Sequence, residues 1–79
     1  MQTEEKIHTP PPITGYRKLT QAEVDLMNRV KAKGDELGAL IDELKANQSL
    51  DQRWVAIGRT DAQTAIMALV RSIAQPTNF

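Results

Sequence analysis

Apolar residues recur at steps of three, four or seven along residues 24–44, a spacing that places them on one face of a helix. Thr20 and Glu23 precede this stretch with the spacing of a capping box, so we expect the helix to begin there. We expect it to end at about Lys45, whose positive charge suits a helix C-terminus. The apolar stripe consists of Val24, Met27, Val30, Leu37, Ile41 and Leu44, and Leu26 and Leu40 widen it.

A second helical pattern follows after a short turn at Asn47-Gln48. Ser49 and Gln52 repeat the capping spacing, so Ser49 is the predicted N-cap of a helix from about Leu50 to Ala74. Pro76 stands just beyond the predicted end, where proline commonly follows a helix. Two long helices joined by a short loop form an antiparallel hairpin. The predicted fold class is therefore all-α, a helical hairpin.

The apolar face of the second predicted helix is too broad for one partner helix to cover. Further apolar residues (Val55, Met67 and Val70) lie on other sides of it. A helix that is apolar on most sides is buried on most sides, so we expect several copies to assemble into a homo-oligomer. We interpret Trp54 as a core anchor. The main face consists of Leu50, Trp54, Ile57, Ala62, Ala65, Ile66, Leu69 and Ile73.

The length of 79 residues predicts one small domain with a core that is marginal by itself. The chain has no cysteine and one histidine, which excludes disulfides and argues against a structural zinc site. Residues 1–13 are expected to form a flexible, extended N-terminal arm that contains His8 and the triplet Pro10-Pro11-Pro12. The helical hairpin domain should span residues 14–75, and residues 76–79 should form a C-terminal tail.

The charge and residue inventory excludes several functions. Ten basic and ten acidic residues cancel, which does not suit a general DNA or RNA binder. The pattern of two long helices is also a poor match to a helix-turn-helix DNA reader. No apolar run approaches the length of a membrane-spanning helix. The sequence contains no Cys nucleophile, no Ser/His/Asp set and no metal-binding cluster, so we expect neither an enzyme nor a cofactor.

One polar cluster stands just before the first predicted helix. Tyr16, the only tyrosine, is followed by Arg17 and Lys18, and Lys31 lies within the helix. An aromatic face together with cations near a helix N-terminus suits a nucleobase and its phosphates. Alternatively, Tyr16 packs at the junction of arm and helix while Lys31 extends its stem over the apolar stripe. Gly34 and Gly38 admit either another helix or a flat ligand.

A second polar cluster interrupts the second predicted helix. Gly58 is unfavourable in a helix interior, and the polar residues that follow it are Arg59, Thr60, Asp61, Gln63 and Thr64. An Arg fork binds phosphate, while Thr and Gln hydrogen-bond to bases or phosphate oxygens. The alternative is a salt-bridged collar between subunits. Arg53 and Arg71 lack such company and are interpreted as surface or interface charges.

With these residues in view, the chain resembles the phage anti-CBASS cyclic-oligonucleotide sponges, which share a hairpin domain with the anti-Thoeris sponges. The resemblance covers about residues 14–75 and rests on three features of the sequence. These are Leu-Thr-Gln-Ala-Glu-Val-Asp-Leu-Met at 19–27, Lys31 downstream, and Trp-Val-Ala-Ile-Gly-Arg-Thr-Asp at 54–61.

The resemblance implies a homohexamer in the cytoplasm of the infected bacterial host. Such a protein binds immune second messengers without cleaving them, and so evades CBASS defence. It implies that cyclic dinucleotides such as cyclic GMP–AMP bind between two protomers at Tyr16 and Lys31, with Arg17 and Lys18 nearby. It implies that cyclic trinucleotides such as cyclic triadenylate bind where three protomers meet, at Arg59 and Thr60, with Gln63 and Thr64 as further candidates. The competing hypothesis is a helical oligomerisation module that has no small-molecule ligand.

Overall fold

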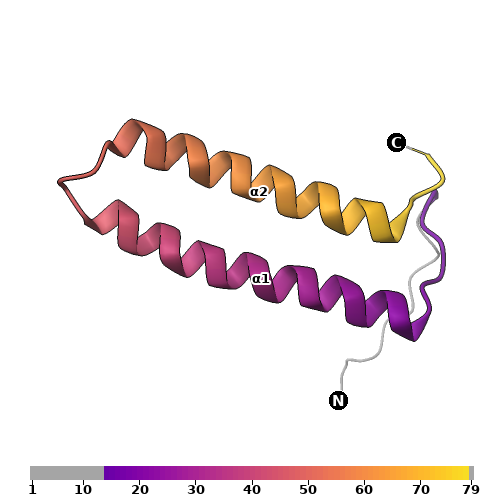
Figure 1. Ribbon diagram of the computed structural model, residues 1–79. Helices are drawn as coiled ribbons and strands as arrows, with labels where there is room; N and C mark the ends of the chain where they lie inside the picture. The colour runs from indigo at the N-terminus through magenta and orange to yellow at the C-terminus, as the bar shows by residue number, and fades with distance from the viewer. Residues whose placement is uncertain (1–13, 79) are drawn as a thin grey trace, which may run out of the picture.

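The computed structural model describes residues 14–78, which form two α-helices and no strand. Helix α1 spans Gln21–Ala46 and helix α2 spans Gln52–Ala74. Figure 1 shows the two helices side by side and antiparallel, joined by a turn at one end. The segments before α1 and after α2 meet at the other, open end. The predicted helical hairpin is confirmed, whereas the predicted N-terminal arm lies outside the described residues.

Helix α1 begins with the predicted capping box. The Thr20 hydroxyl accepts a hydrogen bond from the backbone N–H of Glu23 (3.1 Å), and the Glu23 carboxylate accepts one from the backbone N–H of Thr20 (2.8 Å). These reciprocal bonds satisfy two backbone donors that have no partner inside the helix. At its other end, α1 extends one residue beyond the predicted Lys45, and the N–H of Asn47 donates to the carbonyl of Leu44 (3.2 Å).

The predicted cap of α2 is wrong, because Asp51 rather than Ser49 caps this helix. The Asp51 carboxylate accepts from the backbone N–H groups of Arg53 (3.1 Å) and Trp54 (3.2 Å). Ser49 donates its N–H and its hydroxyl to the side-chain oxygen of Asn47, at 3.1 and 2.7 Å. Asn side chains readily hold a chain in a turn in this way, so Ser49 belongs to the turn and α2 begins after it.

Gln52 also acts differently from the prediction. Its side-chain amide donates to the carbonyls of Leu44 (3.2 Å) and Asn47 (2.8 Å). These are backbone acceptors at the C-terminal end of α1, which the helix itself leaves unpaired. The first residue of α2 therefore closes the end of α1 and ties the two helices together at the turn.

The two helices approach each other closely at Gly34. A Cβ atom placed on Gly34 would lie 3.2–3.4 Å from three side-chain carbons of Ile66, so a larger residue would require the Ile66 side chain to shift. Close helix packing, one of the two alternatives for these glycines, is therefore confirmed for Gly34. Apart from the neighbouring residues and backbone of their own helix, no described atom comes within 4 Å of the corresponding position at Gly38 or Gly58.

The hairpin covers little of its apolar surface. Among the described residues, Ile41 alone is buried, with 8% of its surface exposed. Trp54 remains 61% exposed and Met67 71% exposed. Trp54 is therefore not part of a core in the single hairpin, because two helices side by side leave the outer sides of both uncovered. Its role as a core anchor in an oligomer stays a prediction. Neither described helix is long and apolar enough to cross a membrane.

Candidate functional site

The open end of the hairpin is closed by contacts between segments that lie far apart in the sequence. The backbone N–H of Thr77, beyond α2, donates to the carbonyl of Gly15, before α1, at 2.6 Å. Gly15 adopts a positive φ of 90°, a backbone conformation that residues other than glycine rarely adopt. A Cβ at this position would also collide with the side chain of Asn78. The sequence therefore needs glycine here for both its backbone conformation and its close neighbour.

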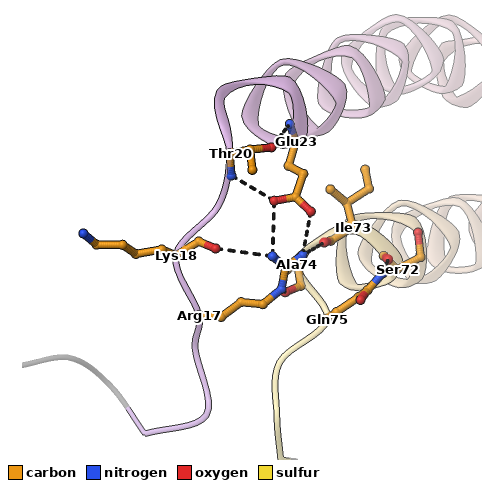
Figure 2. A network of polar contacts seen from close by, with 8 residues as sticks. All are labelled: Arg17, Lys18, Thr20, Glu23, Ser72, Ile73, Ala74 and Gln75. Carbon is orange, nitrogen blue, oxygen red and sulfur yellow. Dashed lines mark hydrogen bonds and ion pairs between the residues drawn. The ribbon is translucent and has the colours of Figure 1, made fainter.

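Arg17 is the centre of a hydrogen-bond network at this end (Figure 2). Its guanidinium donates to the last carbonyls of α2, with 2.8 Å to Ile73 and 3.0 Å to Ala74. It also donates to both carboxylate oxygens of Glu23 (3.2 and 2.8 Å) and to the carbonyl of Lys18 (3.3 Å). Arg17 thereby caps the C-terminal end of α2, where a cation is favourable, and links it to the start of α1.

The pairing of Arg17 with Glu23 changes the ionisation of both groups. The hydrogen bonds from Arg17, supported by the backbone N–H of Thr20, lower the pKa of Glu23 to about 2. The hydrogen bond to Glu23 raises the pKa of Arg17. The two side chains keep 31% and 30% of their surfaces exposed, so solvent screens much of their attraction. The pair therefore stays charged at neutral pH but is a modest source of stability.

Next to this network lies a pocket of about 400 Å³ that brings Tyr16 and Lys31 together. Tyr16 comes from the segment before α1, Lys31 from the middle of α1, and Arg71 from the last turns of α2. The volume falls within the range of small-molecule sites. An aromatic side chain and two cations border an otherwise apolar floor. The pocket is lined by Tyr16, Lys31, Ile66, Met67, Val70, Arg71, Ala74 and Pro76.

The structure separates the four residues predicted for the dinucleotide site. Tyr16 and Lys31 line the pocket, whereas Arg17 and Lys18 are not among its lining residues. The guanidinium of Arg17 is engaged with Glu23 and the end of α2, and the side chain of Lys18 points away from this network in Figure 2. Contact of Arg17 or Lys18 with a ligand remains a prediction.

Arg71 is a pocket residue that sequence reasoning missed. It was interpreted as a surface or interface charge because it has no polar cluster around it in the sequence. Arg71 lines the pocket, and its guanidinium donates to the carbonyl of Asn78 (3.4 Å). The signal that could have found it is the antiparallel pairing, which brings the end of α2 beside the start of α1.

The second predicted site lies toward the turn and has a different composition from the prediction. Arg59 and Thr60 border a depression of about 400 Å³ together with Lys45 and Gln52. Arg59 takes part in neither of the two ion pairs that residues 14–78 form. Gln63 and Thr64 do not line this depression, and the Thr64 hydroxyl donates to the carbonyl of Thr60 (3.1 Å) within the helix. Lys45 was considered only as a helix terminator, so its position beside Arg59 was missed.

The two-helix hairpin has a known counterpart. Residues 11–74 match the model of a domain family described as Acb2/Tad1, hairpin domain, and the chain belongs to that family. The chain is also similar to Anti-CBASS protein 2 of Pseudomonas phage JBD67. The two are 40% identical over an alignment of 98 positions, gaps included, which covers 81% of this chain and 91% of the relative. The resemblance drawn from the sequence is therefore confirmed at the level of the family.

Proposed function

We propose that this protein is a non-enzymatic sponge, which binds cyclic di- and trinucleotide immune messengers and keeps them from the effectors of CBASS defence. It would act in the cytoplasm of a bacterium infected by a phage. The similarity to Anti-CBASS protein 2 supports the biological role. The observation that carries the proposed chemistry is the convergence of Tyr16, Lys31 and Arg71, from three separate segments, on one pocket.

The pocket residues match the parts of a cyclic dinucleotide. Tyr16 offers a ring on which a base stacks, a contact that contributes about 1–3 kcal/mol. Lys31 and Arg71 supply positive charge for the phosphates, and Arg adds a fork that can donate two hydrogen bonds. The apolar side chains of Ile66 and Val70 form the floor beneath the ligand. Because the pocket is open to one side, a second protomer would cover the remaining half of the ligand.

We infer a homohexamer as the functional assembly. Nine large apolar side chains of the described segment are exposed in the single hairpin, Trp54 and Met67 most among those on the helices. Exposed apolar surface of this extent marks protein interfaces. Gly38 and Gly58 also leave open space along the hairpin that another helix could enter.

The depression at Arg59 and Thr60 is the proposed trinucleotide site. Lys45 and Arg59 provide two cations from different helices, which suits a ligand with several phosphates. Gln63 and Thr64 lie one turn further along α2 and would act from a neighbouring protomer or through the helix surface. We propose no DNA, RNA or membrane partner, and no step that breaks a bond in the ligand.

The proposal is tested by calorimetry on the full chain with cyclic GMP–AMP and cyclic triadenylate, together with native mass spectrometry. We expect binding of both ligands to a hexamer and recovery of intact nucleotide after long incubation. Tyr16→Ala should weaken the dinucleotide about 10–100-fold, which corresponds to the loss of one stacked base.

Lys33→Ala is the matched control for Lys31→Ala, because Lys33 lies on the same helix but does not line the pocket, and it pairs with Glu36 (3.6 Å). The control should change affinity less than twofold. If neither nucleotide produces heat, the ligand-free oligomerisation module becomes the better account. Recovery of linear nucleotide would instead overturn the non-enzymatic mechanism.

A further inference from the structure

The residues on both sides of Tyr16 are anchored to the C-terminal end of the hairpin. On one side, the Gly15 carbonyl accepts the hydrogen bond from the N–H of Thr77 at 2.6 Å. On the other side, the Arg17 guanidinium donates to the carbonyls of Ile73 and Ala74 at 2.8 and 3.0 Å. Tyr16 itself is 65% exposed and lines the pocket.

The backbone at Tyr16 is therefore held by bonds that its own segment does not supply. Residues 14–20 belong to neither helix, and a segment of this kind is mobile unless other parts of the chain restrain it. Gly15 itself adopts a positive φ and lies close to the side chain of Asn78. Pro76, in the same tail, lines the pocket beside Tyr16.

We propose that the tail of residues 75–78 and Arg17 are positioning elements that set where the Tyr16 ring meets the ligand. This inference rests on the proposed nucleotide site and extends it by assigning a role to residues outside the pocket chemistry. The tail fixes Tyr16 before the ligand arrives, so less conformational entropy is lost on binding. Arg17 contributes by holding the chain in place rather than by contacting phosphate.

The Thr77 N–H can be removed without changing the pocket residues. Thr77→Pro lacks the donor, whereas the matched control Thr77→Ala keeps it. We expect Thr77→Pro to weaken the binding of cyclic GMP–AMP about tenfold, because binding then has to order about one backbone residue. Thr77→Ala should stay within twofold of the wild type. Deletion of residues 77–79 removes the same donor without introducing proline, and it also removes the Asn78 carbonyl that accepts from Arg71. It should therefore weaken binding at least as much as Thr77→Pro, while Gln75 still caps α2.

A double-mutant cycle with Tyr16→Ala separates positioning from a general loss of structure. If the tail acts through the Tyr16 ring, Thr77→Pro should lower the affinity for cyclic GMP–AMP less than twofold in the Tyr16→Ala background. Cyclic triadenylate affinity and subunit number should not change in any of these variants. An equal loss with and without the ring, or unchanged affinity in both Thr77→Pro and the deletion, would overturn the positioning role. If Tyr16→Ala itself binds normally, the proposed nucleotide site fails instead.

Discussion

The two ends of the hairpin are organised by different kinds of contact. At the open end, Arg17 and Thr77 form hydrogen bonds between residues 56 to 62 positions apart in the sequence, and a pocket lies beside them. At the turn, the bonds of Asn47, Asp51 and Gln52 join residues no more than eight positions apart. The open end is thus built by tertiary contacts within one chain. The Arg59 depression lies toward the turn, and under the proposed assembly a neighbouring protomer would complete it.

This comparison has a functional meaning under the proposed mechanism. The dinucleotide pocket already has its aromatic residue, its cations and its restraints in a single hairpin. The Arg59 depression has cations but no comparable network of restraints among the described residues. We therefore expect the two ligand classes to depend on different residues and to differ in how strongly they depend on assembly.

The largest expected effect is that each of two variants loses affinity for one ligand and keeps it for the other. Lys31→Ala should lower the affinity for cyclic GMP–AMP about 100-fold and keep the affinity for cyclic triadenylate within twofold. Arg59→Ala should lower the affinity for cyclic triadenylate about 100-fold and keep that for cyclic GMP–AMP within twofold. Hydrogen bonds to charged groups contribute about 1.5–3 kcal/mol, which gives an effect of this order. Calorimetry with both ligands checks the pattern. Arg29→Ala, an exposed change on α1, is the control. Equal loss of both ligands in either variant would mean one shared site.

An intermediate effect is expected from the exposed aromatic residue near the turn. Trp54→Ala should weaken subunit association at least 30-fold, the equivalent of an interface residue that contributes 2 kcal/mol or more. Sedimentation at a series of protein concentrations measures the change. Lys33→Ala is the control, since the Lys33 side chain is 78% exposed but is not apolar. Unchanged assembly in Trp54→Ala would remove this residue from the proposed interface.

The smallest expected effect concerns the Arg17–Glu23 pair and pH. The pKa of Glu23 is lowered from 4.5 to about 2 in the folded chain, so its stabilising contribution is present above about pH 4.5 and disappears as pH falls toward 2. Glu23→Gln should flatten the pH dependence of thermal unfolding in this window, measured by circular dichroism at constant protein concentration. Glu36→Gln, at an exposed pair, should not. An unaltered slope in Glu23→Gln would exclude the pair as its source.

Several elements were predictable because their causes are local. The capping box of Thr20 and Glu23 acts over three residues, and the structure contains it as predicted. The start of α2 was predicted incorrectly for a similarly local reason. Ser49 and Asp51, two positions apart, each had a suitable side chain, and the competing bond from Ser49 to Asn47 decided between them. Spacing by itself does not reveal which of two caps is already engaged.

The pocket was only partly predictable. Tyr16 and Lys31 stood out as chemically suitable residues, but Arg71 and Pro76 belong to the same pocket only because the helices are antiparallel in one particular register. Arg17 stood out for its charge, and the same charge serves to cap the end of α2. A residue's chemistry was readable from its type, while the group that it meets depends on segments more than fifty positions away.

The sequence by itself determined the two helices, their antiparallel pairing and the family, because apolar periodicity, caps and motifs are properties of neighbouring residues. The tertiary structure decided which polar side chains meet. It placed Arg71 beside Tyr16 and Lys31, turned Arg17 toward the end of α2, and brought the C-terminal tail against Gly15. The physical reason is that these contacts follow from helix register and from hydrogen bonds between distant backbone groups, neither of which leaves a periodic signal in the chain.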